Sequence, residues 1–128
     1  PPPRERLRSM IVGHLEALHG RSDEVAVVLS EWRSLSPASR RRIVKLRDRV
    51  DAMWDEALGD AAKAGLVGGD LKLLRLALLG AMNWSLQWYA PKGALSITTM
   101  ADRILDLFVR EPGRGRRPAR SAKRRRSP

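Results

Sequence analysis

The sequence predicts an all-α domain, a bundle of five helices that pack in antiparallel or orthogonal pairs. Apolar residues recur at intervals of three and four along most of the 128-residue chain, and no segment alternates convincingly as a strand. Prolines and glycines divide the chain into five helical units. The chain is long enough to bury a core without cross-links, and its lack of cysteine excludes disulfides, thiolate metal sites and thiol catalysis.

The first two helices are expected before residue 35. The first spans about residues 4–19, with apolar residues four, four and three positions apart, and Gly20 ends it. Ser22 is the N-cap of the second helix, where two acidic residues in the first turn complement the helix dipole. The apolar stripes are Leu7, Ile11, Leu15 and Leu18 in the first helix, and Val25, Val28, Leu29 and Trp32 in the second.

The third helix has the clearest start and stop signals. Ser36 is its cap, and Pro37 occupies the first helical position, where the missing N–H costs nothing. Apolar residues then repeat at three or four positions until Gly65 marks the end.

The fourth helix is apolar on nearly every side. Asp70 caps it, and it is expected to run to about Tyr89. All-round apolarity indicates burial from two directions, so a fifth helix capped by Ser96 could complete a four-helix bundle with a second subunit. The expected dimer interface consists of Leu73, Ala77, Gly80, Ala81, Trp84, Trp88, Ile97, Met100, Ile104 and Phe108. The alternative is a monomer with the fourth helix fully buried at its centre.

Most of the net charge of +11 lies at the C-terminus. Residues 111–128 carry +7 of it, so residues 1–110 carry only +4. We expect a domain over residues 1–111 and a disordered basic tail over 112–128, because small side chains there cannot offset the entropy of ordering. The tail is either a solvated extension or a source of contacts to DNA phosphates. Its candidate phosphate-binding residues are Arg114, Arg116, Arg117, Arg124, Arg125 and Arg126.

Catalytic, cofactor and metal sites are not indicated. His14 and His19 point about 140° apart on a helix and cannot hold one metal ion. There is neither a glycine-rich phosphate loop nor a nucleophile elbow, so we expect no enzyme. The most apolar segment, residues 71–89, is interrupted by polar side chains and predicts no membrane span. The acidic residues of the third helix are interpreted as a solvated face that pairs with Arg47, namely Asp51, Asp55 and Glu56.

Two stretches resemble the C-terminal domain of TetR-family transcriptional regulators: EWRSLSPASRRRIVKLRDRVDAMW at residues 31–54 and LLGAMNWSLQWYAPKGALS at residues 78–96. The likeness is closest to the branch related to repressors of fatty-acid and steroid catabolism. It implies a cytoplasmic bacterial homodimer, nucleoid-associated when bound to DNA, whose last two helices dimerise and whose earlier helices enclose an apolar effector pocket. It also implies an N-terminal helix-turn-helix domain, and none precedes Arg4, so a fragment of a longer regulator is expected.

The resemblance favours a ligand pocket, with ordinary core packing as the competing interpretation. The expected lining consists of His14, Leu18, Trp32, Met53, Trp54 and Ala57. The implied effector is a hydrophobic acyl or steroid-derived group, with a coenzyme A thioester among the candidates and Arg40, Arg41 or Arg42 available to its phosphates. His14 could donate to a ligand carbonyl, although a core or boundary position is the commoner role of a histidine. The alternative function is a stand-alone helical interaction protein whose basic tail binds nucleic acid or an acidic partner.

Overall fold

The computed structural model describes residues 1–20, 31–90 and 92–110, and this part of the chain contains four α-helices and no strand. The elements are α1 (Pro3–Gly20), the 3₁₀ turn η1 (Trp32–Ser34), α3 (Pro37–Lys63), α4 (Leu71–Trp84), the 3₁₀ turn η2 (Ser85–Gln87) and α5 (Ile97–Phe108). The predicted all-α class is confirmed. Most of the predicted second helix and all the tail arginines, Arg114 to Arg126, lie outside the described residues.

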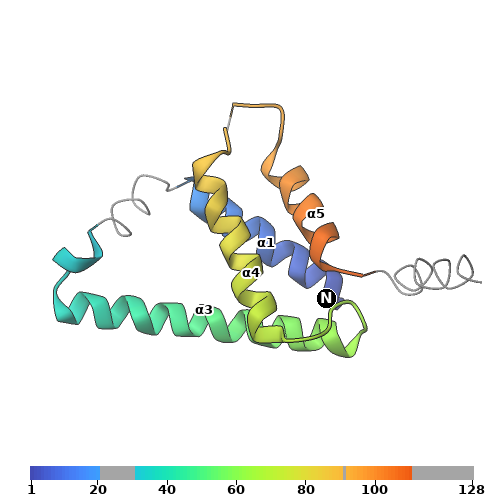
Figure 1. Ribbon diagram of the computed structural model, residues 1–128, viewed down its shortest axis with the longest axis horizontal. Coiled ribbons are helices and arrows are strands. Elements are labelled where there is room, and N and C mark those ends of the chain that lie inside the picture. Colours follow the sequence, from blue (N-terminus) through green and yellow to red (C-terminus); the bar gives the residue numbers. More distant parts are fainter. Residues whose placement is uncertain (21–30, 91, 111–128) are drawn as a thin grey trace, which may run out of the picture.

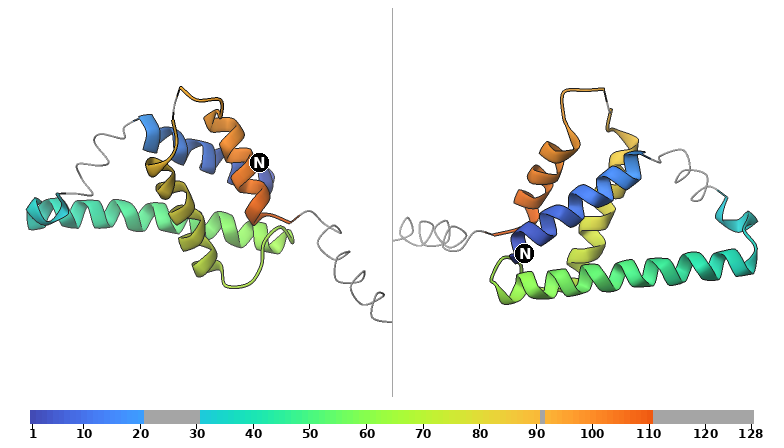
Figure 2. Two further views of the ribbon diagram at one scale, coloured as in Figure 1. Left: turned by 45° about the horizontal axis from the view of Figure 1, so that its top comes forward. Right: turned by 180° about the vertical axis from the view of Figure 1, so that it is seen from behind.

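Helix α1 lies at the centre of the bundle (Figure 1). It packs against α5, α3 and α4, and α4 crosses the C-terminal half of α3. Figure 2 shows that α1 and α3 approach each other at the start of α1 and diverge along its length. The N-terminal half of α3 therefore extends beyond the other three helices. None of the described helices combines the length and the apolar character that a membrane crossing requires.

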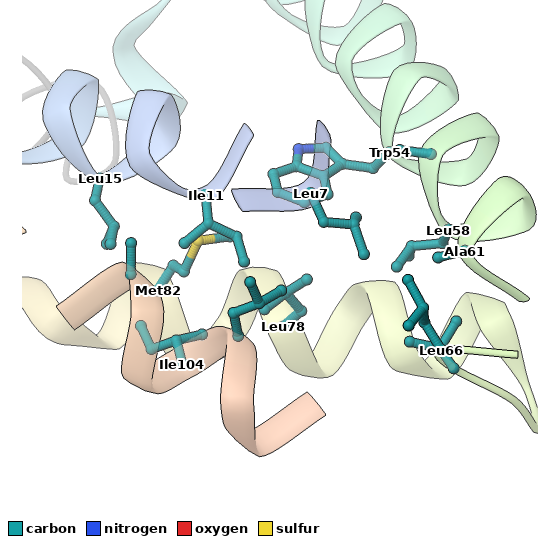
Figure 3. Packing of buried hydrophobic residues seen from close by; sticks show 14 of the residues in the cluster. Leu7, Ile11, Leu15, Trp54, Leu58, Ala61, Leu66, Leu78, Met82 and Ile104 are labelled. Carbon is teal, nitrogen blue, oxygen red and sulfur yellow. The ribbon is translucent and has the colours of Figure 1, made fainter. Parts of the chain in front are cut away.

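One hydrophobic core joins the four helices (Figure 3). The whole stripe predicted for the first helix is buried, because it faces α3, α4 and α5 at once. Each fully buried Leu or Ile contributes about 1.5–3 kcal/mol from removal of apolar surface from water. The buried side chains that meet in the core include Leu7, Ile11 and Leu15 of α1, Trp54 and Leu58 of α3, Leu78 and Met82 of α4, and Ile104 and Leu105 of α5.

Three of the four predicted helix caps are confirmed, and the fourth, Ser22, lies outside the described residues. The side chains of Ser36, Asp70 and Ser96 each accept a hydrogen bond at 3.1 Å from the backbone N–H three residues later. These bonds satisfy donors that have no partner within the helix, which is why α3, α4 and α5 begin where the polar residue stands.

Helix α3 ends at the predicted glycine. Gly65 has φ = 79°, a left-handed conformation that a residue without Cβ adopts at little cost. Its N–H donates to the Ala62 carbonyl at 3.0 Å, and the Leu66 N–H donates to the Ala61 carbonyl at 2.9 Å. This pair of bonds is a Schellman motif, and the buried side chains of Leu66 and Ala61 give it the usual apolar contact.

The prediction that the fourth helix runs to Tyr89 is wrong. Helix α4 ends at Trp84, and the chain tightens into η2 at Ser85. The Ser85 hydroxyl donates to the Met82 carbonyl at 2.5 Å and competes there with the α-helical bonding pattern. Serine therefore stops this helix from within an apolar sequence that otherwise favours its continuation.

Candidate functional site

An apolar hollow of about 200 Å³ lies between α1 and α3, where the two helices diverge. We call it the α1–α3 hollow. A glycine in the middle of α1 is part of its wall, and a Cβ added to Gly13 would meet no atom within 4 Å. Since glycine costs a helix about 1 kcal/mol relative to alanine, its presence at this wall keeps space that a side chain would occupy. The lining residues are Met10, Gly13 and His14 of α1 and Val50, Met53 and Trp54 of α3.

His14 is the polar group of the α1–α3 hollow. Its ring meets the indole of Trp54 edge to face, with centroids 6.4 Å apart, and Trp54 is only 3% exposed. Nε2 of His14 forms a hydrogen bond of 2.9 Å with Oδ1 of Asn83 on α4. The hollow is thus lined by an indole ring, two flexible methionine side chains and one imidazole. This lining suits a small apolar group that carries a hydrogen-bonding atom.

Three of the six residues expected at a pocket line this hollow: His14, Met53 and Trp54. Leu18 and Ala57 are buried elsewhere in the structure, and Trp32 lies half-buried on η1. The hollow also includes Met10, Gly13 and Val50, which sequence reasoning missed. A glycine inside the helical pattern of residues 4–19 was the available signal, because glycine costs a helix about 1 kcal/mol relative to alanine.

The carboxylates of α3 pair with other helices. Nη1 of Arg75 on α4 lies 3.3 Å from Asp51, and its Nε lies 2.8 Å from Asp55. Arg75 therefore takes the place that the sequence analysis assigned to Arg47, because a long side chain from the crossing helix reaches both carboxylates. Glu56 lies 3.6 Å from Arg6 of α1.

Arginines of α1 form ion pairs with α3 and with α5. Arg6 also contacts Asp60 of α3 at 3.1 Å. Arg8 makes two contacts with Asp102 of α5, at 2.6 and 3.3 Å. The hydrogen bond from Arg8 lowers the pKa of Asp102 below its usual range, since it favours the ionised carboxylate.

The outer face of α4 is exposed and apolar. It consists of Leu73, Leu76, Ala77, Gly80, Ala81 and Trp84, which share one side of the helix. Leu73 is 62% and Trp84 65% exposed, and Trp88 just beyond the helix is also exposed. The opposite side, with Leu78 and Met82, is buried in the core of the same chain.

Helix α5 presents a different side from the one expected. Met100 and Ile104, placed at a dimer interface by the sequence analysis, are buried among α1 and α4 residues of the same core. Ile97 and Phe108 are half-buried against that core. Leu107 is the large apolar residue of α5 that is exposed to solvent, at 81% exposure. Burial in the chain's own core leaves Met100 and Ile104 little surface for a partner.

The second histidine, His19 at the end of α1, forms a hydrogen bond with a buried serine. Ser85, fully buried, donates to the Met82 carbonyl, so its oxygen accepts the Nε2–H of His19 at 2.7 Å. The His19 ring also packs on Tyr89, with centroids 4.6 Å apart. Burial lowers the pKa of His19, because the charged imidazolium is poorly solvated there. In the described part of the chain, no cluster of three His, Asp or Glu side chains could hold a metal ion.

Residues 1–111 match the family model described as the tetracyclin repressor-like C-terminal domain. Among solved structures, superantigen PfiT is 32% identical, with a TM-score of 0.78 over 87% of this chain and 60% of its own. AibR, solved in complex with isovaleryl coenzyme A and operator DNA, is 26% identical, with a TM-score of 0.70 over 84% of this chain and 60% of its own. PfmR from Thermus thermophilus, a TetR family transcriptional regulator, is 27% identical, with a TM-score of 0.76 over 88% of this chain and 62% of its own.

The chain thus spans only 60–62% of the length of these three structures. No curated protein matches it in sequence. The family model covers all the described helices, from α1 to α5. On that match, this protein belongs to the family of tetracyclin repressor-like C-terminal domains.

Proposed function

We propose that this chain is the effector-binding and dimerisation domain of a bacterial TetR-like transcriptional repressor. The observation that carries the proposal is the α1–α3 hollow, an apolar site with one imidazole, in a chain of this family. Filling it with a ligand would shift the helices and release the repressor from its operator.

The effector is proposed to be a hydrophobic acyl group carried as a coenzyme A thioester. AibR, which was solved with isovaleryl coenzyme A, supports this class of ligand. The volume of about 200 Å³ lies below the roughly 300–1,000 Å³ typical of sites for drug-sized ligands, so it favours a short acyl group over a steroid. Arg42 is exposed and lies eight residues before Val50, about 12 Å along the helix, where it could reach the phosphates.

A second copy of the chain is proposed to cover the outer face of α4. Contiguous apolar surface of this kind is typical of interaction sites, and the small residues Ala77, Gly80 and Ala81 would let two helices approach closely. Trp84 and Trp88 would anchor the contact.

DNA is proposed to be read by an N-terminal helix-turn-helix domain, with tail arginines adding phosphate contacts that carry no base specificity. A helix-turn-helix pattern in the coding sequence immediately upstream would support this assignment. Its absence would favour the stand-alone interaction protein.

Titration with acyl-CoA esters tests the effector site. We expect isovaleryl-CoA and other short acyl-CoA esters to change the tryptophan fluorescence saturably, because Trp54 lines the hollow, and free coenzyme A to act weakly or not at all. Met53→Glu should weaken binding about tenfold, equal to about 1.4 kcal/mol, since Met53 is 54% exposed but lines the hollow, where a bound acyl group would partly cover the new carboxylate.

Ala52→Glu is the matched control for that variant. Ala52 is exposed on the same helix and is absent from the lining of the hollow, so the added charge should leave binding unchanged. The proposal is wrong if no acyl chain length gives a saturable response, or if Met53→Glu binds as tightly as the wild type.

A further inference from the structure

Both walls of the α1–α3 hollow are fastened to α4. On the α1 wall, His14 is hydrogen-bonded to Asn83 at 2.9 Å. On the α3 wall, Asp51 and Asp55 flank two lining residues in the sequence and bind Arg75 at 3.3 and 2.8 Å. Arg75 and Asn83 are eight residues apart, so the two attachments are separated by about 12 Å along α4.

The geometry of α1 and α3 makes these attachments sensitive to the content of the hollow. The two helices are held together at one end by Arg6, which contacts Asp60 at 3.1 Å and Glu56 at 3.6 Å. They diverge beyond that point, and the hollow lies between the diverging segments. A group that fills this hollow tightly pushes α1 away from α3, because the close-packed core beside the hollow has no slack to absorb it. Helix α4 cannot then keep both attachments unchanged.

The two attachments differ in strength. The Arg75 side chain is only 12% exposed and contacts two carboxylates, whereas the contact of His14 with Asn83 is a single bond at the surface. Charge-assisted bonds of arginine are roughly twice as strong as neutral ones. When α1 is pushed away from α3, α4 should therefore stay with α3, and the bond between His14 and Asn83 should break. Asn83 immediately precedes Trp84, which belongs to the outer face of α4.

We propose that Arg75 and Asn83 are positioning residues that couple the filling of the α1–α3 hollow to the outer face of α4. In this arrangement α4 stays with α3 through Arg75, and it loses only its contact with His14 of α1 when His14 turns from Asn83 to the ligand, while the core contacts of Leu78 and Met82 remain. The inference rests on the proposed effector site, but it concerns which contacts transmit occupancy, and a substitution that fills the hollow can test it without a ligand.

Gly13→Leu is that substitution, since a Cβ at Gly13 meets no atom within 4 Å and the position lines the hollow. The protein is labelled with 5-fluorotryptophan, and the four tryptophan ¹⁹F resonances are assigned by Trp→Phe variants. We expect Gly13→Leu to shift the resonance of Trp54, which reports the hollow, and that of Trp84, which reports the outer face of α4. The control is Gly59→Leu, a helical glycine with equally open space that is not part of the lining, and it should move neither resonance.

Removal of the contact should separate the two responses. In an Asn83→Ala background, Gly13→Leu should still shift Trp54, while the accompanying shift of Trp84 is lost. Asn83 is exposed, so Asn83→Ala should fold. Arg75→Met leaves two carboxylates without their cation, which destabilises the protein, so this variant serves only as a second test. The inference is overturned if Trp84 stays unmoved while Trp54 shifts, or if the Trp84 shift survives Asn83→Ala.

Two further arms keep the result decisive. Val50→Phe fills the hollow from the α3 wall, and a Trp54 resonance that ignores both filling substitutions would count against the hollow and the inference together. Isovaleryl-CoA added to the wild type should reproduce the Gly13→Leu pattern. If Gly13→Leu moves both resonances and acyl-CoA esters move neither, the coupling stands and the proposed effector class falls.

Discussion

At the scale of single residues, the contact between His19 and Ser85 places a titratable imidazole where burial disfavours its charged form. Ser85 is buried, and its hydroxyl proton goes to the Met82 carbonyl, so the imidazole must supply the donor. The neutral Nε2–H tautomer satisfies this need. Protonation would add a charge on the other ring nitrogen in a partly desolvated position beside Tyr89.

This contact predicts a loss of stability in mild acid. Burial lowers the pKa of His19 below its ordinary value of 6.5, so below about pH 6.5 the unfolded chain binds more protons than the folded one. The free energy of unfolding must then fall as the pH falls through that window. His19→Gln keeps a donor for Ser85 but cannot titrate, so between about pH 7.5 and 5.5 the wild type should lose more stability than the variant. Urea unfolding at several pH values measures both slopes, and parallel slopes would contradict this explanation.

At the scale of helices, local signals and tertiary contacts decide different features. The caps of α3, α4 and α5 could be predicted from single residues, because a side-chain acceptor three positions before a free N–H acts without the rest of the fold. The Schellman stop of α3 at Gly65 is equally local. The end of α4 was not predictable in this way, since the hydroxyl of Ser85 breaks the helix only where the Met82 carbonyl and His19 receive it.

The α4 cap provides a direct measure of such a local contribution. Asp70→Ala should lower the free energy of unfolding by about 1 kcal/mol, because the Leu73 N–H loses its 3.1 Å acceptor. Asp70→Ser retains an acceptor oxygen and should stay close to the wild type. Urea denaturation followed by far-UV circular dichroism gives both values. A loss as large with serine as with alanine would show that charge, and not the capping bond, matters at this position.

The candidate site was predictable only in part, for the same physical reason. Periodicity identified Met53 and Trp54 as residues of an apolar stripe, and they do line the hollow. Periodicity does not show which side of a broad apolar stripe faces the chain's own core. Met100 and Ile104 of α5 were therefore expected at a dimer interface, but they are buried within the chain. The pairing of Asp55 with Arg75 likewise depends on the crossing of α3 and α4, which no spacing within one helix reveals.

At the scale of the whole molecule, α4 is apolar on two sides, but only its inner side is covered by the core of the same chain. Its inner side, with Leu78 and Met82, completes the core built on α1. Its outer face leaves Leu73, Leu76 and Trp84 in water, which is unfavourable for a protein that remains alone. The contacts of Asn83 and Arg75 join α4 to the residues on and beside the walls of the α1–α3 hollow, so the proposed ligand and the proposed partner would act on one helix.

Sedimentation equilibrium of the purified chain tests this arrangement most directly. We expect the wild type to behave as a particle of two copies at micromolar concentration, and Ala77→Glu to behave as a single copy, because it places a charge at the centre of the outer face of α4. Ala52→Glu, which adds the same charge on the exposed side of α3, should remain two copies. A wild-type chain that sediments as one copy at high concentration would contradict the assignment of this face to a second subunit.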